Sequence, residues 1–98
     1  MQNKAALLIA LKAIPQQRVI SYGGLAKSAG LTNGARQVGA LLKSLPCDTT
    51  LPWHRVVNSQ RKISFAKDSE QFNKQKRLLQ DEGIIFIKDK ICQTQFMG

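Results

Sequence analysis

The chain has few of the residues from which metal sites and membrane spans are built. Its 98 residues include one histidine, His54, and two cysteines, Cys47 and Cys92, which lie far apart without Cys-x-x-Cys spacing. A zinc site cannot be assembled from so few ligands, and neither a metal nor another cofactor is expected. The longest apolar run, 5–10, is far below a bilayer span, and no signal peptide is visible. We therefore expect a cytoplasmic protein, nucleoid-associated if bacterial, that has no membrane partner.

Acidic residues are also scarce. Fifteen Lys and Arg stand against six Asp and Glu, which gives a net charge of +9 and an isoelectric point near 10.1. This imbalance favours nucleic acid as the partner, with a merely solvated basic surface as the alternative. The length allows one compact core, and no repeat, linker or dimerisation helix is evident. We expect a single domain over 1–98 that is monomeric.

Apolar spacing predicts three helices in the first half of the chain. Asn3 is a candidate N-cap for the first, which Pro15 ends. Ser21 is the predicted N-cap of a short second helix, and Gly30 ends it in a left-handed turn. Thr32 or Asn33 caps the third, which runs to Pro46. The apolar positions of the three helices are Leu7, Leu8, Leu11, Ile14, Leu25, Ala26, Ala29, Val38, Leu41, Leu42 and Leu45.

The second and third of these helices are typical of a helix-turn-helix. The outer side of the third helix is small and basic, since it carries Arg36 near its start and then Gly39 and Ala40. Small residues let a helix approach a polyanion closely, which is typical of a recognition helix. The alternative is that Gly39 and Ala40 only permit packing between helices.

The second half is more loosely patterned. Residues 55–64 are predicted as a wing-like hairpin, and Asp68-Ser69-Glu70-Gln71 resembles a capping box that opens a helix ended by Gly83. The inner side of that helix carries Phe72, Gln75, Leu78 and Leu79. Residues 84–87 are a buried strand or a terminal apolar plug. The predicted fold class is mainly α with a small β wing, a winged helix-turn-helix-like single domain.

One pentapeptide carries a specific chemical signal. Pro52-Trp53-His54-Arg55-Val56 resembles the reactive loop of the O6-alkylguanine-DNA alkyltransferases, in which a Pro-Cys-His-Arg-Val run supplies the thiol that removes an alkyl group from guanine. Trp53 stands where that cysteine would be, and an indole is no nucleophile at neutral pH. The resemblance is closer still to the alkyltransferase-like proteins, which carry tryptophan or another residue there. It extends over the blocks 19–22, 25–26, 35–39, 52–57, 78–79 and 82–83.

The resemblance implies which residues meet DNA. The counterpart of Tyr22 crowds the phosphate 3′ to the target nucleotide, and the counterpart of Arg36 enters the base stack in place of a flipped base. The implied DNA-binding and base-flipping residues are Ser21, Tyr22, Ala35, Arg36, Gln37, Gly39 and Ala40.

The resemblance also implies a lesion pocket. Its residues are Pro52, Trp53, His54, Arg55, Val56, Phe65 and Lys67. His54 and Glu82 match a relay that prepares the thiol in the alkyltransferases, and without a thiol they suit a structural hydrogen-bond network, so no catalytic residue is expected. Two plainer interpretations stay open: Trp53 as a core residue, and Lys67 as a solvated lysine before a helix.

The function implied by the resemblance is that of a non-enzymatic DNA damage sensor. Such a protein flips O6-alkylguanine of double-stranded DNA into its pocket without alkyl transfer and marks the site for nucleotide excision repair proteins. Two alternatives remain. One is a winged-helix transcriptional regulator, and the other is a degenerate alkyltransferase that uses Cys47 as its nucleophile. The family's usual Asn-Pro pair is Leu45-Pro46 here, which weakens the catalytic alternative.

Overall fold

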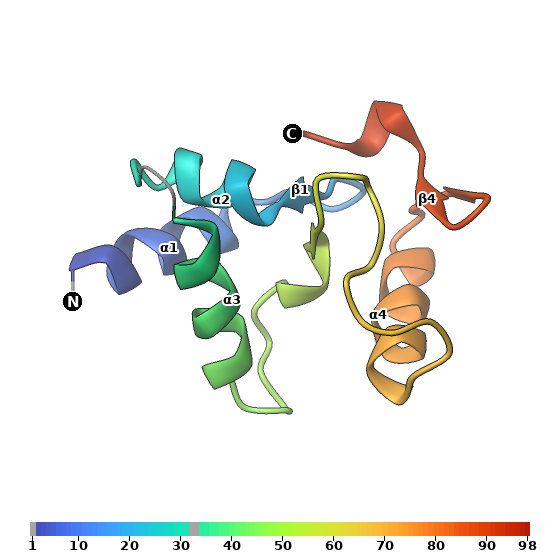
Figure 1. Cartoon of the computed structure of the whole chain (residues 1–98), viewed down its shortest axis with the longest axis horizontal. Coiled ribbons are helices and arrows are strands. Elements are labelled where there is room, and N and C mark those ends of the chain that lie inside the picture. Colours follow the sequence, from blue (N-terminus) through green and yellow to red (C-terminus); the bar gives the residue numbers. More distant parts are fainter. Residues whose placement is uncertain (1, 32–33) are drawn as a thin grey trace.

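The computed structural model describes residues 2–31 and 34–98 and consists mainly of helices (Figure 1). The α-helices of these residues are α1 (Gln2–Lys12), α2 (Tyr22–Ser28), α3 (Ala35–Ser44) and α4 (Glu70–Asp81). The strands are β1 (Ile20–Ser21), β2 (Val56–Val57), β3 (Phe86–Ile87) and β4 (Lys90–Ile91), and the 3-10 helices are η1 (Trp53–Arg55) and η2 (Gln93–Gln95). The predicted fold class, mainly α with a little β structure, is confirmed. None of the described helices is long and apolar enough to cross a bilayer.

The predicted helix-turn-helix is formed by α2 and α3. The Oγ of Ser21 accepts a hydrogen bond from the backbone N–H of Gly24 at 2.9 Å, which caps α2. Gly30 has a φ of +80°, the left-handed conformation that ends the helix. Val38 and Leu41 lie buried on the inner side of α3. The Ser21 cap and the left-handed Gly30 are as predicted, and of the predicted stripe Val38 and Leu41 are buried whereas Leu42 and Leu45 are partly buried.

Two other predicted caps are not found. α1 already includes Asn3, so the prediction that this residue precedes the helix is wrong. Thr32 and Asn33 lie outside the described residues, and Gly34 is the residue that precedes α3, without a side-chain cap. A Cβ on Gly34 would lie 2.9 Å from the Cβ of Ala26. Close packing of the turn on α2, rather than capping chemistry, therefore selects the residue at this position.

The strand pair β1–β2 divides the apolar core into two clusters. The strands run parallel, with Ile20 opposite Val56 and Ser21 opposite Val57. Because successive side chains of a strand point to opposite faces, Ile20 and Val56 pack on one side, whereas Val19 and Val57 pack on the other. The first cluster joins α1, α2 and α3 and adds Leu7, Leu11, Ile14, Leu25, Ala26, Val38 and Leu41. The second joins α4 to the C-terminal segment and adds Ile63, Phe72, Leu79, Ile84 and Ile91.

The predicted wing hairpin at 55–64 is wrong. The strand in this segment, β2, pairs with β1 instead. Asn58 then closes a turn, because its Oδ1 accepts hydrogen bonds from the backbone N–H groups of Gln60 at 2.9 Å and Lys62 at 3.0 Å. An Asx turn of this kind redirects the chain without a second strand.

Within the described residues, the antiparallel hairpin is formed later in the chain, by β3 and β4. Its turn residues Lys88 and Asp89 have φ values of +51° and +67°, a conformation that Asn-Gly or Asp-Gly would have signalled and Lys-Asp does not. Ile84 is buried, but Ile85 and Ile87 are 57% and 59% exposed. The prediction of a buried strand or plug therefore holds only for Ile84.

α4 follows its prediction closely. Ser69 caps it, since its Oγ accepts a hydrogen bond from the N–H of Phe72 at 3.1 Å. Gly83 has a φ of +92° just beyond the helix. Phe72, Gln75 and Leu79 are buried on its inner side.

Candidate nucleic-acid interface and base pocket

The outer side of α3 is open to solvent. Ala35, Arg36, Gln37 and Ala40 are exposed, and a Cβ on Gly39 would meet nothing within 4 Å. The alternative that Gly39 and Ala40 serve helix packing within this chain is therefore wrong. Arg36 lies in the first turn, where its charge adds to the positive end of the helix dipole. α3 thus presents a low, basic surface of the kind that approaches a polyanion.

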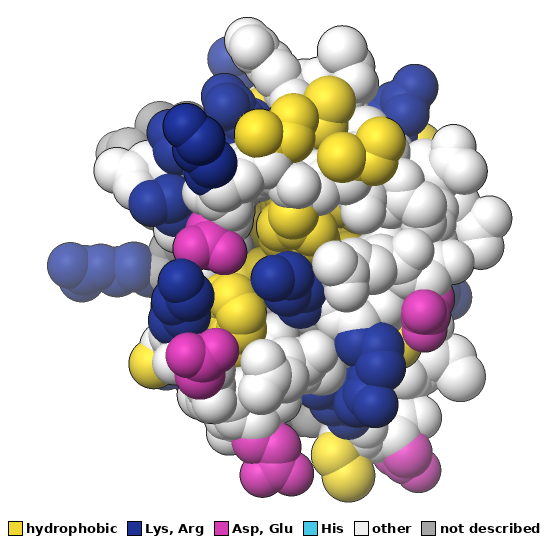
Figure 2. Space-filling model, turned by 90° about the vertical axis from the view of Figure 1, so that its right-hand side faces the viewer, with side chains coloured by type: hydrophobic (Ala, Val, Ile, Leu, Met, Phe, Trp, Pro, Cys, Tyr) yellow, Lys and Arg dark blue, Asp and Glu magenta, His cyan; other side chains and the backbone are white. Residues whose placement is uncertain are grey.

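Charge is distributed unevenly along the chain. On the face formed by α4 and the β3–β4 hairpin, Lys and Arg side chains are interspersed with Asp and Glu (Figure 2). All acidic residues lie at position 48 or later. All charged side chains of the first 47 residues are positive, namely Lys4, Lys12, Arg18, Lys27, Arg36 and Lys43. Most of the net positive charge, six of the nine units, therefore belongs to the helix-turn-helix half of the chain.

A pocket of about 250 Å³ opens beside α3, and we name it the base pocket. Gly39 and Lys43 on α3 line one side, and Trp53 and Phe65 line it from the two loops that precede and follow β2. The remaining lining residues are Tyr22, Leu42, Val56, Ser64 and Gln75. The structure therefore brings Trp53, Val56 and Phe65 together with the recognition helix, which the sequence places far from all three.

Tyr22 connects the helix-turn-helix to the far wall of this pocket. It is the first residue of α2, and its hydroxyl shares a hydrogen bond of 2.5 Å with the Oγ of Ser64. Ser64 comes directly before Phe65 in the loop that leads to α4. The base pocket thus has a polar rim on one side of an otherwise largely apolar wall.

Trp53 is partly exposed and lies in η1, not in either core cluster. The interpretation of Trp53 as a core residue is therefore wrong. The neighbouring His54 ring meets it edge-on, with centroids 5.9 Å apart and an interplanar angle of 85°. The flat face of the indole remains available to line the base pocket.

His54 and Arg55 do not line the base pocket and instead bind Glu82 at the end of α4. The Oε2 of Glu82 lies 2.8 Å from His54 Nε2 and 2.7 Å from Arg55 Nη2, and its Oε1 accepts from Arg55 Nε at 2.9 Å. Arg55 Nη1 also donates to the carbonyl of Ile14 at 2.7 Å. Pro52 precedes η1 and is not among the lining residues either. The side chains of His54, Arg55 and Glu82 therefore connect η1 to the end of α4, and Arg55 also connects it to Ile14 of the first core cluster.

The electrostatics of this cluster fit a structural tie. Burial by itself would raise the pKa of Glu82, but the hydrogen bonds from Arg55 and His54 outweigh burial and hold the pKa below its ordinary value. Glu82 is therefore a fixed carboxylate that orients the Arg55 guanidinium and the His54 ring. Its contact with His54 is the geometry expected of the family relay, here without a thiol at the next position.

Gln75 is a pocket residue that sequence reasoning placed on the inner side of α4 without a role. It is only 2% exposed, and its Nε2 donates to the carbonyls of His54 at 2.9 Å and Val56 at 3.0 Å. It therefore anchors the backbone on both sides of Arg55 and holds η1 over the base pocket. A single amide among apolar positions of a helix face was the only signal of this role in the sequence.

Lys67 lies away from the base pocket. Its Nζ is 3.0 Å from Asp89 Oδ2 in the β3–β4 turn, and its side chain is 67% exposed. This hydrogen bond raises the pKa of Lys67. The structure thus does not bring Lys67 to the other predicted pocket residues, and Lys43 supplies the positive charge at the pocket wall instead.

Cys47 lines a neighbouring cavity and does not line the base pocket. No cysteine lines the base pocket in the part of the chain that the structure describes. No group of three or more His, Cys, Asp or Glu side chains gathers there to hold a metal ion. The described lining of the base pocket therefore offers apolar surfaces and hydrogen-bonding groups but no thiol.

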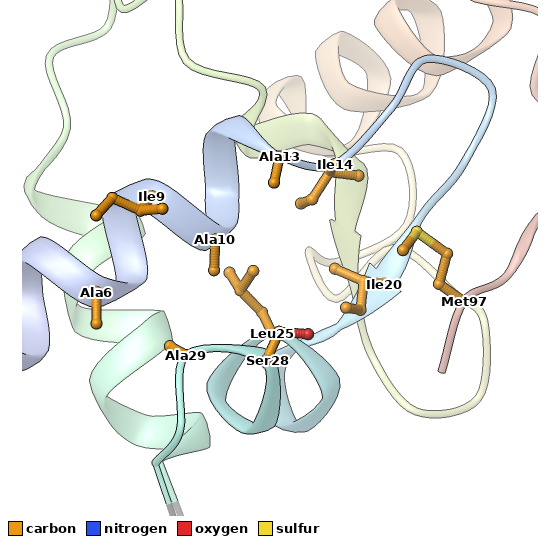
Figure 3. A pocket seen from close by; sticks show the side chains of 10 residues that line it. All are labelled: Ala6, Ile9, Ala10, Ala13, Ile14, Ile20, Leu25, Ser28, Ala29 and Met97. Atoms are coloured by element: carbon orange, nitrogen blue, oxygen red, sulfur yellow. The ribbon is translucent and has the colours of Figure 1, made fainter.

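A larger groove of about 400 Å³ lies between α1 and α2, away from these residues (Figure 3). Its walls are aliphatic, with Ala6, Ile9 and Ala10 from α1 and Met97 from the C-terminal segment pointing toward the same space. Ser28 is the one polar side chain among the described residues that line it. A nucleobase needs hydrogen-bond partners on its edge, so the smaller base pocket is the better site for one.

The chain matches the sequence profile of the 6-O-methylguanine DNA methyltransferase DNA-binding domain over residues 2–84. It is 48% identical over 73 residues to the DNA base-flipping protein of Escherichia coli. The matched region covers 74% of this chain and 55% of that protein. It is also 42% identical over 71 residues to alkyltransferase-like protein 1 of Schizosaccharomyces pombe. This match covers 72% of this chain and 66% of that protein. The chain thus spans only a little more than half the length of the bacterial relative.

The fold is similar to that of the S. pombe alkyltransferase-like protein in complex with damaged DNA containing O6-carboxymethylguanine. The TM-score is 0.79 at 36% identity, over 88% of this chain and 80% of that one. The Mycobacterium tuberculosis O6-methylguanine methyltransferase gives a TM-score of 0.67 at 28% identity, over 81% of this chain and 47% of that one. The chain belongs to the family of the 6-O-methylguanine DNA methyltransferase DNA-binding domain and, within it, to the alkyltransferase-like proteins.

Proposed function

We propose that this protein binds O6-alkylguanine in duplex DNA, holds the nucleotide flipped into the base pocket and leaves the alkyl group on the base. The observation that carries this proposal is the position of Trp53. It lines a pocket next to the exposed face of α3. The resemblance of residues 52–56 to the reactive loop implies that the related enzymes carry their thiol at this position. An indole offers a stacking surface but no nucleophile.

The geometry gives each part of the site a task. The small residues Gly39 and Ala40 let the backbone of α3 approach DNA closely. Arg36, two residues into α3, fills the gap that the flipped base leaves, because a guanidinium plane can stack between neighbouring bases. Tyr22 lies at the pocket rim and crowds the phosphate next to the flipped nucleotide. The base pocket then receives the base between Trp53 and its opposite wall.

The relatives support the same function. One is named a DNA base-flipping protein, and another was solved with DNA that contains O6-carboxymethylguanine. Because the protein leaves the bound lesion unrepaired in this scheme, binding contributes to repair only by recruiting other proteins. We extend the proposal to a monomer that marks the lesion for nucleotide excision repair.

The degenerate alkyltransferase is disfavoured by the same geometry. Cys47 is exposed and lines a neighbouring cavity, but its side chain is not part of the base pocket lining where a flipped base would lie. The transcriptional regulator is disfavoured because the outer face of α3 carries Gly39 and Ala40 after its first turn, and these residues have no side-chain donors or acceptors to read base edges.

Fluorescence of Trp53 tests whether the base enters the pocket. Trp53 is the only tryptophan, so the signal has one source. A duplex with one O6-methylguanine should change its emission at saturation, because the flipped base stacks on the indole and excludes water. The same duplex with guanine should change it much less, with anisotropy of a labelled strand confirming saturation in both cases. Equal changes with the two duplexes would show that the indole does not sense the lesion.

A further inference from the structure

A second chamber, which we name the side chamber, adjoins the base pocket. It has a volume of about 180 Å³ and shares Leu42, Trp53 and Phe65 with the base pocket. Its other lining residues are Leu45, Pro46, Cys47, Thr49, Gln71 and Lys74. Trp53 therefore lines both cavities, and a group that extends from the base pocket past Leu42, Trp53 and Phe65 enters the side chamber.

Lys74 brings a positive charge to this chamber. It projects from α4, three residues after Gln71, so both side chains lie on one side of the helix. Its Nζ lies 6.0 Å from the centroid of the Trp53 ring and 3.5 Å from the carbonyl oxygen of Cys47. Lys74 is exposed, and its ammonium is directed toward the Trp53 ring that lines both cavities. A single long hydrogen bond leaves the ammonium with donors for another acceptor.

Acidic side chains do not oppose this charge inside the two cavities. Among the described lining residues, Lys43 belongs to the base pocket and Lys74 to the side chamber, and neither cavity has an Asp or Glu in its lining. Asp48 follows Cys47 in the chain but does not line the chamber. An anion that reaches the side chamber therefore meets a cation without an acidic lining competitor.

We infer that the side chamber receives the O6 substituent of the flipped base, and that Lys74 makes the protein prefer short substituents that end in a carboxylate over neutral ones of the same shape. This rests on the proposed function, because the base must occupy the base pocket. The reactive thiol of the related enzymes meets the alkyl carbon at position 53, so a base bound in the same sense directs its substituent at Trp53. Trp53 also lines the side chamber, so a substituent that reaches this residue has the side chamber next to it.

The size of the preference follows from the exposure of Lys74. A fully exposed ion pair adds little, whereas a charge-assisted hydrogen bond in a partly enclosed site adds more. Lys74 lies between these limits, since it is exposed but lines a cavity. We expect a roughly five- to tenfold preference for the carboxylate, which is more than most exposed ion pairs contribute and less than a buried hydrogen bond to a charged group contributes.

The test uses three duplexes of one sequence with unmodified guanine, O6-isobutylguanine or O6-carboxymethylguanine at the same position. The isobutyl and carboxymethyl groups each consist of a CH2 attached to a carbon that bears two further heavy atoms, but only the carboxymethyl group is charged. Dissociation constants are measured for the wild type, Lys74→Met and Lys76→Met. Lys76 is the matched control, because it also projects from α4 over aromatic rings, 6.0 Å from Phe72 and 5.5 Å from Phe86, but lines neither cavity.

We expect the wild type and Lys76→Met to bind the carboxymethyl duplex about five- to tenfold more tightly than the isobutyl duplex, and Lys74→Met to bind both equally. A ratio near one in the wild type, or an unchanged ratio in Lys74→Met, would overturn the inference. If the isobutyl duplex still binds more tightly than the unmodified one, the proposed function stands without the side chamber. If neither modified duplex is preferred over guanine, the proposed function itself fails.

Discussion

Replacing Arg55 with methionine should lower the free energy of unfolding by about 2 to 4 kcal/mol. Arg55 is a buried crosslink, with its side chain only 12% exposed, and it reaches Glu82 with two nitrogens and the carbonyl of Ile14 with a third. Methionine keeps most of the apolar stem but leaves a largely buried carboxylate and a carbonyl without these donors. Breaking one side of such a pair costs more than the pair itself contributes, because the remaining charge stays buried.

Urea unfolding of the wild type and Arg55→Met measures this difference, and Arg77→Met provides the control, since Arg77 is an exposed residue of α4. The difference should also depend on pH. Because the pKa of Glu82 is held low in the folded protein, the stabilisation is present above the unfolded-state pKa of about 4.3 and is lost as pH falls through the lower folded value. The two proteins should therefore converge in acid. An Arg55→Met effect no larger than that of Arg77→Met would show that the cluster is not a structural tie.

Replacing Arg36 with alanine should weaken binding to a duplex with one O6-methylguanine by about 1 to 3 kcal/mol, or roughly 5- to 150-fold. The reason is that an extruded base leaves an unstacked gap, and the guanidinium fills it from the first turn of α3. Affinity for the unmodified duplex should fall much less, because no base is extruded there and the substitution removes only one positive charge that can contact a phosphate.

Lys27→Ala is the matched control for Arg36→Ala. Lys27 is an exposed cation in the last turn of α2, on the same helix-turn-helix. Its loss should reduce binding to both duplexes by a similar, salt-dependent factor. If Arg36→Ala behaves in the same way, Arg36 is one of many surface charges and does not insert into the stack.

The helix-turn-helix could be predicted because its signals are local. The Ser21 cap, the left-handed Gly30 and the break at Pro46 each act within a few residues of their own position. The wing could not be predicted correctly, because β2 pairs with β1 across more than thirty residues of chain and no short-range pattern encodes that choice. The Lys88–Asp89 turn was missed because it lacks the glycine that usually marks such a conformation.

The candidate site divides in the same way. A motif placed Trp53 in a pocket, and the structure brings Phe65 from the next loop to the same cavity. The buried anchor Gln75 and the chamber residue Lys74 depend on how α4 packs under η1, a tertiary arrangement that no sequence spacing reports. His54 and Arg55 stand in the same motif as Trp53 but turn to the opposite side, where Glu82 holds them.

Lesion binding without alkyl transfer is tested most directly by incubating the protein with an excess of O6-methylguanine duplex, measuring its affinity against the unmodified duplex, and then recording the intact mass of the same sample. The proposed function predicts a clear preference for the lesion, an unchanged protein mass and a DNA strand that still carries its methyl group. A protein that gains the mass of one methyl group, mapped to Cys47 or Cys92, would contradict it.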